Sequence, residues 1–404
     1  MRILSFVFLL AIAYTSCTFY YQRPQNQTQN ITKPTVLLIS IDGYGYNYTE
    51  KYNPPNLKKF KDSGSSAESL IPVFPSKTFP NHLSMETGLY PEDHGIVAMQ
   101  FMDGSREFKN SKNSSDPSFY LAEPIWKCVQ RNGMVTASYF WPCSDAITPD
   151  YYFKYSQSTP NEERIVQVLN WLQFAQTEKP HLITLYFSDV DLAGHIFGPD
   201  SKELKDAIFK VDRELGLLFD TIESKKFDVN TIVVSDHGMN RLIKKIKLPR
   251  EVVNDKDILI SDMGPVPLFY ISNQDKLEKT YALLKKLEKK EKDKFKVYKR
   301  NDIPRSLHYS KSKRIGDLVL IANPGFTFEN GKPLKVEKIG LHGYNPNSVN
   351  MHGIFYAKGP QIHSGMKIKS FENIHVYSFI EKILGIDCGK NTSSNSKYTQ
   401  VLVN

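Results

Sequence analysis

The sequence lacks an internal repeat, a low-complexity tract and, beyond its first residues, any apolar run of the ~20 residues that a membrane-spanning helix needs. These absences exclude a repeat array and a second membrane span. With 404 residues, of which 40% are hydrophobic and 24% charged, the chain is long enough to bury a sizeable globular core.

Cysteine is also scarce, with four residues in the whole chain. Cys17 lies at the end of a stretch that we expect to be removed, which leaves Cys128, Cys143 and Cys388 and hence at most one disulfide. Cys128 and Cys143 can pair if "IWKCVQRNG" ends a helix and "VTASYF" is the strand after it, a geometry that the sequence leaves open.

The N-terminus, "MRILSFVFLLAIAYTSC", has the layout of a secretory signal peptide: one arginine, a short apolar stretch, then small or polar residues. We expect a signal peptide over 1–17, a glycosylated spacer over 18–32, one folded domain over 33–390 and a tail over 391–404. The chain should be secreted, or held at the cell surface by an uncleaved anchor or a tether. Five N-x-S/T sequons agree with this location, at Asn26, Asn30, Asn47, Asn113 and Asn391.

The net charge of +9 does not indicate a nucleic-acid partner. The lysines concentrate between Lys276 and Arg300, where Tyr281, Leu284 and Leu287 fall three apart. This spacing predicts a solvated amphipathic helix, with no groove for a polyanion, and nothing in the pattern indicates more than a monomer.

The body of the chain alternates apolar strands with amphipathic helices. "TVLLISI", "HLITLYF" and "NTIVVS" are typical of buried parallel strands, and the segments from Glu162 and Lys202 space their apolar residues three and four apart. The pattern predicts an α/β fold, with a mostly parallel central sheet and helices on both faces.

Acidic residues follow all three strands: Asp42, then Asp189 and Asp191, then Asp236 beside His237. Ligand sites in parallel sheets lie beyond the carboxyl ends of the strands, so these carboxylates should meet. Three such ends favour a metal site over three unrelated turns.

Histidines complete this pattern. His195 comes four residues after Asp191, across a glycine that permits a tight turn, and His352 precedes another apolar run. Mixed carboxylate and imidazole ligands suit zinc, and their number predicts two ions. His82, His94, His342 and His363 are expected to be structural or to support the ligands.

The segment "FPSKTFPNH" holds one hydroxyl in a rigid frame. Its two prolines predict a non-helical conformation, either an ordinary turn or a mount for a nucleophile. Two metal ions are typical of in-line displacement at phosphorus, which makes Thr78 the candidate nucleophile.

Together these segments resemble the nucleotide pyrophosphatase/phosphodiesterase family of ectoenzymes, in the alkaline phosphatase superfamily. The resemblance runs in consistent order from about Lys33 to Asp387. Its motifs are "ISIDG", "FPSKTFPNHLSMETGLYPEDHGIV", "EPIW", "FWPCSD", "DVDLAGHIFGPDS", "VVSDHGM" and "LHGYNPNSVNMHGIFYAKGP". It implies an alkaline-phosphatase-like layered sandwich whose catalytic domain is the folded domain over 33–390.

The resemblance also implies a ligand set and a mechanism. One zinc would be bound by Asp191, His195 and His352, and the other by Asp42, Asp236, His237 and Thr78. Thr78 would attack phosphorus, and water would then release the threonine-bound intermediate. A substrate base would stack between Phe79 and Tyr155, with Trp141 and Asp145 in the pocket wall.

One departure from the family pattern affects the expected activity. The family usually has an asparagine where this chain has Met99, and the loss of such a donor costs about 3 to 4 kcal/mol of transition-state stabilisation. Gln100 could supply an amide only from a shifted loop. The expected function is hydrolysis of nucleotide phosphodiester or pyrophosphate bonds. The alternatives are a choline-phosphodiester (glycerophosphocholine-type) hydrolase and a catalytically weakened ectodomain that acts as a binding protein.

Overall fold

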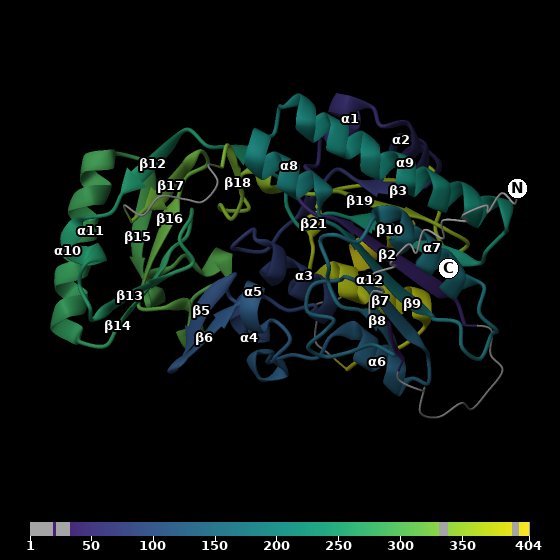
Figure 1. Cartoon of the computed structure of the whole chain (residues 1–404), viewed down its shortest axis with the longest axis horizontal. Helices are drawn as coiled ribbons and strands as arrows, with labels where there is room; N and C mark the ends of the chain where they lie inside the picture. The colour runs from purple at the N-terminus through teal and green to yellow at the C-terminus, as the bar shows by residue number, and fades with distance from the viewer. Residues whose placement is uncertain (1–18, 22–32, 331–337, 390–395, 404) are drawn as a thin grey trace, which may run out of the picture.

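A large and a small lobe make up the computed structural model, which describes residues 19–21, 33–330, 338–389 and 396–403 (Figure 1). The large lobe contains a nine-stranded sheet in the order β1-β8-β7-β9-β2-β10-β19-β3-β20, of which the neighbours β8, β7, β9, β2 and β10 are parallel. The strands are β1 Phe19–Tyr21, β8 Tyr151–Phe153, β7 Thr136–Tyr139, β9 Leu182–Phe187, β2 Thr35–Ile41, β10 Val229–Val234, β19 Phe355–Lys358, β3 Ser65–Ala67 and β20 Lys367–Ile368.

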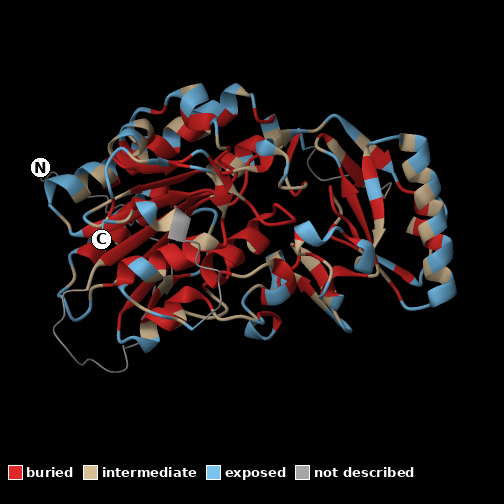
Figure 2. Ribbon diagram, turned by 180° about the vertical axis from the view of Figure 1, so that it is seen from behind, coloured by how far each residue is buried: buried red, intermediate tan, exposed pale blue. Residues whose placement is uncertain are grey.

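Helices cover both faces of this sheet, as the sequence predicts. Strands β2, β9 and β10 are buried along their whole length, because apolar helices pack on either side of them (Figure 2). One face packs against α2 Pro55–Ser63, α7 Asn161–Leu172 and α9 Lys202–Ser224, and the other against α3 Thr78–Thr87, α6 Ile125–Arg131 and α12 His375–Leu384. The fold is therefore an α/β layered sandwich with a mostly parallel central sheet.

The small lobe is built on an antiparallel sheet in the order β13-β14-β16-β15, with α11 Gln274–Glu291 packed on it. The sequence predicted one amphipathic helix from Lys276 to Arg300, and that prediction is wrong beyond Glu291. Lys292 and Asp293 have positive φ and end the helix, and Phe295 and Val297 then alternate inward in a strand. The strands are β13 Ile258–Ser261, β14 Leu268–Ile271, β16 Leu318–Ala322 and β15 Phe295–Lys299, beside the pair β12 Lys244–Lys247 and β17 Phe326–Glu329.

The remaining helices and strands are short. They are α1 Tyr48–Tyr52, β4 Leu70–Ile71, α4 Pro91–His94, β5 Gln100–Asp103, β6 Arg106–Lys109, α5 Asn110–Asn113, α8 Asp189–Phe197, β11 Asn240–Arg241, α10 Arg250–Val253, β18 Gly340–Leu341 and β21 Phe371–Glu372. Within the described ranges, no helix combines the length and the apolar character needed to cross a bilayer.

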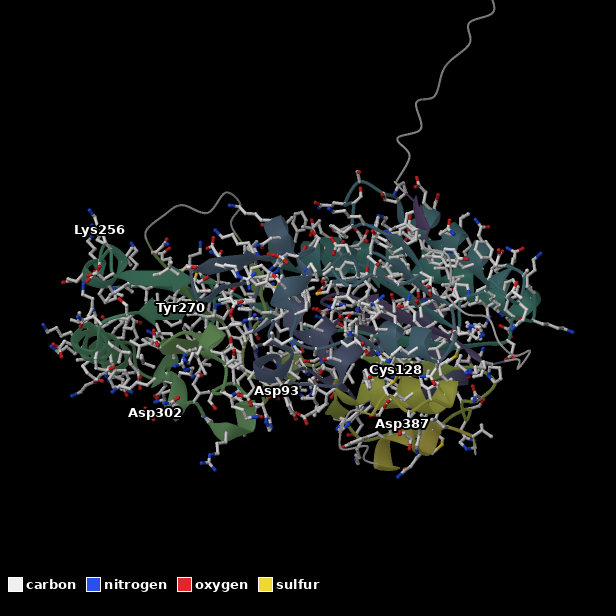
Figure 3. All side chains as sticks on the ribbon, turned by 90° about the horizontal axis from the view of Figure 1, so that it is seen from below. Asp93, Cys128, Lys256, Tyr270, Asp302 and Asp387 are labelled. Atoms are coloured by element: carbon white, nitrogen blue, oxygen red, sulfur yellow. A yellow bond between two sulfur atoms is a disulfide. The ribbon has the colours of Figure 1, made fainter. Side chains whose placement is uncertain are left out.

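The disulfide joins Cys128 to Cys388, which decides against Cys143, the partner that the sequence left open. Cys128 lies on α6, which faces the C-terminal helix α12, and the bond closes a separation of 260 residues (Figure 3). Cys143 is a free thiol buried among Phe74, Leu83 and Val266, on the side of α3 that faces the small lobe.

Two of the five expected glycosylation sites fall on described residues. Asn47 is exposed at the start of α1. Asn113 is half-buried, and its side-chain amide donates to Glu107 O at 2.9 Å while its oxygen accepts from Lys109 N at 2.8 Å. Asn26, Asn30 and Asn391, like the expected signal peptide, lie outside the described residues.

Candidate active site

The carboxyl ends of three adjacent parallel strands meet at one edge of the sheet. Asp42 follows β2, Asp191 lies in the first turn of α8 just after β9, and Asp236 and His237 follow β10. These side chains converge because β9, β2 and β10 are neighbours in the sheet. Together with His195 and His342 they form the Asp/His cluster.

The first part of the cluster, Asp42, Asp236 and His237, is called the buried half. Its side chains are 0–2% exposed. His237 Nε2 lies 3.1 Å from Asp236 Oδ2 and 3.5 Å from Asp42 Oδ1. The Thr78 hydroxyl lies 3.4 Å from the same nitrogen, so the candidate nucleophile belongs to this half.

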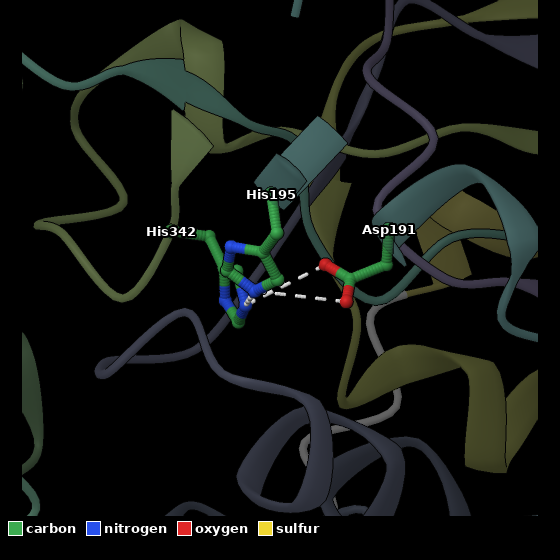
Figure 4. Close-up of side chains that lie close together, drawn as sticks. All are labelled: Asp191, His195 and His342. Atoms are coloured by element: carbon green, nitrogen blue, oxygen red, sulfur yellow. Dashed lines mark hydrogen bonds and ion pairs between the residues drawn. The ribbon is translucent and has the colours of Figure 1, made fainter. Parts of the chain in front are cut away.

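The second part, Asp191, His195 and His342, is called the open half, because its side chains are 9–18% exposed (Figure 4). Nε2 of both His195 and His342 lies 3.6 Å from an Asp191 oxygen, and the two nitrogens are 3.1 Å apart. Asp191 and His195 meet because they are four residues apart on α8. The tight turn expected at the intervening glycine is therefore wrong, since Gly194 is helical.

The Asp/His cluster contains His342 where the sequence predicted His352. Both ring nitrogens of His352 are engaged elsewhere, with Ser69 Oγ and Pro346 O, each at 2.8 Å. A glycine follows both His342 and His352, as it follows His237, so the sequence does not distinguish the two as candidate ligands. The loop after β18 brings His342 to the site, where its ring stacks on that of His237 with centroids 3.6 Å apart.

The three imidazoles of the cluster are oriented in the same way. Each places Nδ1 against a backbone carbonyl: His195 on Gly340 O at 2.8 Å, His237 on Gly238 O at 3.0 Å and His342 on Ser76 O at 2.9 Å. Nδ1–H donates to that carbonyl, which leaves each Nε2 lone pair facing the cluster. Burial lowers the pKa of His195 and of His342, so both favour the neutral form that binds metal.

Unpaired carboxylate oxygens show that the cluster fits cations. Asp42 Oδ1, Asp191 Oδ1 and Asp236 Oδ2 are buried and accept no hydrogen bond from the described residues. Burial, together with the charges of Asp236 and Asp191, raises the pKa of Asp42 well above its ordinary value. Buried carboxylates that lie this close together repel one another and cost free energy unless a positive charge lies between them. The mixed oxygen and nitrogen donors suit zinc or a similar ion. The donor atoms of Asp191, His195 and His342 lie within 4.8 Å of one another, as do those of Asp42, Asp191 and His237.

Thr78 is the first residue of helix α3, so the expectation of a wholly non-helical frame is wrong from this residue onward. Pro80 is tolerated because amides in the first helical turn need no intrahelical acceptor. The fully buried His82 fixes this turn: its Nδ1 bonds Thr78 O at 2.9 Å, and its Nε2 lies 2.8 Å from Ser40 Oγ on β2. The nucleophile is thereby tied to the central sheet.

The four predicted substrate-binding residues have different environments. Phe79 is half-buried near Phe108, and Tyr155 is 48% exposed, so both rings retain accessible surface. Asp145 is also half-buried, and burial raises its pKa. Trp141 is 2% exposed and packs on His82, so its ring lies in the core, and its place in the pocket wall stays a prediction.

Met99 is half-exposed and directly precedes β5, and the amide of the neighbouring Gln100 does not take the place of the asparagine expected from the resemblance. Gln100 Nε2 donates to Glu107 Oε1 of strand β6 at 2.7 Å. Neighbouring residues of a strand point in opposite directions, so the Gln100 side chain does not follow that of Met99. Asp262 of the small lobe pairs with Lys77 beside the nucleophile, and burial raises the pKa of its carboxyl group.

The Thr78 hydroxyl therefore lies beside two adjoining groups of Asp and His side chains, at the strand ends of an alkaline-phosphatase-like sheet. The chain belongs to the type I phosphodiesterase/nucleotide pyrophosphatase family, whose model matches residues 36–345.

Known relatives agree with this assignment. The chain is 35% identical over 391 residues to ectonucleotide pyrophosphatase/phosphodiesterase family member 1 of Mus musculus, covering 91% of this chain and 43% of that protein. It is 32% identical to venom phosphodiesterase 2 of Crotalus adamanteus, covering 91% of this chain and 47% of that protein. The chain thus spans less than half the length of these relatives.

Solved structures of family member 5 have the same fold. An inactive variant of the murine protein in complex with AMP matches with a TM-score of 0.85 at 28% identity, covering 92% of this chain and 100% of that one. The human protein matches with a TM-score of 0.85 at 29% identity, again covering 92% of this chain and 100% of that one.

Proposed function

We propose that the protein is a two-zinc ectoenzyme that hydrolyses nucleotide phosphodiester and pyrophosphate bonds through a threonine-bound intermediate. The observation that carries the proposal is the Thr78 hydroxyl, 3.4 Å from His237 Nε2, beside three buried carboxylate oxygens that lack a partner among the described residues. Family membership and the AMP complex of a relative support the substrate class.

Asp42, Asp236, His237 and Thr78 would hold one zinc, and Asp191, His195 and His342 the other. When bound, the ions supply Lewis-acid stabilisation of phosphoryl oxygens and lower the pKa of the nucleophile and of water. Helix α3 and His82 hold the Thr78 oxygen in place for attack on phosphorus. The O–P bond forms, the bond from phosphorus to the leaving oxygen breaks, and water later hydrolyses the threonyl ester to release a nucleoside monophosphate.

The open half determines where the leaving group emerges. In-line attack from Thr78 expels the opposite oxygen away from the buried half, and the partly exposed side chains of Asp191 and His195 mark that direction. We also propose secretion after removal of a signal peptide, and action as a monomer on small nucleotides.

Assay of the purified protein on p-nitrophenyl thymidine 5′-monophosphate, ATP and glycerophosphocholine tests this function. We expect hydrolysis of both nucleotides, loss of rate on chelation and recovery on adding Zn²⁺. Thr78→Ala should be inactive and Thr78→Ser partly active. A wild-type rate no higher than that of Thr78→Ala overturns the enzyme hypothesis and favours a binding protein.

A choline-phosphodiester hydrolase is the second candidate, because Met99 supplies no amide to a phosphate oxygen and Gln100 is held by Glu107. Release of glycerol phosphate and choline, or of phosphocholine, without nucleotide cleavage would select it. The same substrate panel therefore separates the two candidates.

A further inference from the structure

Lys338 lies beside the open half of the Asp/His cluster. The next two residues are hydrogen-bonded to His195 on α8. Ile339 N donates to His195 O at 2.8 Å, and Gly340 O accepts from His195 Nδ1 at 2.8 Å. Lys338 immediately precedes these two residues and is exposed, so its backbone is held beside the open half while its side chain retains accessible surface.

The ammonium of Lys338 acts electrostatically on the cluster. Burial is the main cause that lowers the pKa of His195 and of His342, and the positive charge of Lys338 adds to it. Burial also lowers the pKa of Lys338, and the negative charge of Asp191 opposes that effect. No carboxylate of the described ranges pairs with the ammonium within 4.0 Å, and Asp191 lies 3.6 Å from both His195 and His342. Among the described residues, the ammonium therefore has no ion-pair partner.

The other lysine near the nucleophile is already neutralised. Lys77 is 7% exposed and forms a buried ion pair with Asp262. The charge of Lys77 is thus paired with Asp262 of the small lobe, whereas the charge of Lys338 remains available to an incoming anion.

We propose that Lys338 is a specificity-determining residue that binds the second phosphate of a nucleoside polyphosphate or dinucleotide substrate, on the leaving-group side. This inference rests on the proposed function. Thr78 attacks from the buried half, so the leaving group emerges at the open half, where Lys338 lies. A leaving group that begins with a phosphate presents an anion to this ammonium, and a phenolic leaving group presents none at that position.

The kinetic test compares ATP with p-nitrophenyl thymidine 5′-monophosphate in the wild type and in Lys338→Gln. We expect kcat/KM for ATP to fall about tenfold, the usual size for a charge-assisted contact, while that for the ester changes less than about twofold. Lys286→Gln, on the exposed face of α11, is the matched control and should change neither value. Equal losses on both substrates, or none, overturn the proposal.

A binding test works without turnover. In the Thr78→Ala background, calorimetry compares AMP with ADP, and ADP should bind more tightly. Adding Lys338→Gln should remove about tenfold of that excess and leave AMP unchanged. If the wild type hydrolyses no nucleotide, the proposed function fails but this binding difference still decides the role of Lys338. An unchanged ADP excess contradicts it.

Discussion

The two halves of the Asp/His cluster differ in origin and in exposure. The buried half comes from residues directly after β2 and β10, and its side chains are 0–2% exposed. The open half comes from one helix and a distant loop, and its side chains are 9–18% exposed. In the mechanism that we propose, the buried half fixes the nucleophile, whereas the open half admits water and releases the leaving group.

The largest effect on activity should come from the buried half. Asp236→Asn keeps the shape of the side chain but removes a charge from the cluster. Losing about 4 kcal/mol of transition-state stabilisation would lower kcat/KM by about 10³-fold, which the nucleotide ester assay measures.

The same substitution should stabilise the metal-free protein, because Asp236 is one of the charges that raise the pKa of Asp42. We expect the Tm of chelated Asp236→Asn to exceed that of the chelated wild type. A raised folded-state pKa also predicts that the chelated wild type loses stability as pH rises from about 4 through that pKa. A Tm of the chelated variant below that of the chelated wild type would contradict repulsion between the Asp236 and Asp42 carboxylates.

The next effect compares two histidines that the sequence does not distinguish. His342→Ala should lower kcat/KM by about 10²- to 10³-fold and remove one equivalent of bound metal, because it deletes a candidate ligand. His352→Ala should retain both metals and most activity, since its nitrogens bond Ser69 and Pro346. Elemental analysis of the two variants measures the difference. Metal loss in His352→Ala alone would restore the ligand set expected from the sequence.

A smaller effect, of opposite sign, is expected at Met99. Met99→Asn should raise kcat/KM for the nucleotide ester by about tenfold or more, because an amide donor would then face the phosphate oxygen. Gln100→Ala should change the rate little, since its amide bonds Glu107. A decrease in the Met99→Asn variant would show that the thioether contacts the native substrate.

The disulfide should affect stability without affecting either half. Joint replacement of Cys128 and Cys388 by serine should lower the free energy of unfolding by about 2 to 5 kcal/mol, measured by denaturant titration. Nucleotide hydrolysis under native conditions should be preserved, because the bond joins α6 to the chain after α12, away from the cluster. Peptide mapping without reduction should show this link and a free Cys143.

Local sequence patterns predicted the sheet and most of the cluster. Apolar runs identified β2, β9 and β10 because fully buried parallel strands need no polar alternation, and the acids after them lie where such strands end together. The i, i+4 spacing brought Asp191 and His195 together, although through a helix and not through a glycine turn.

Two features had no clear local signature. Trp141 was predicted in the pocket wall, and the structure shows its ring packed in the core, where Glu86 accepts from its N–H at 2.7 Å. The strand at Phe295–Lys299 was obscured by lysines that also suit a helix. Long-range packing resolved both.

The sequence by itself determined the α/β architecture, the acidic strand ends and Thr78 as a candidate nucleophile, because periodicity and strand-end chemistry are properties of short segments. Only the tertiary structure chose His342 over His352, Cys388 over Cys143, and the open direction of the cluster with Lys338 beside it. Those choices depend on which distant loops pack together, and glycine-flanked histidines or isolated cysteines carry no local signal of their partners.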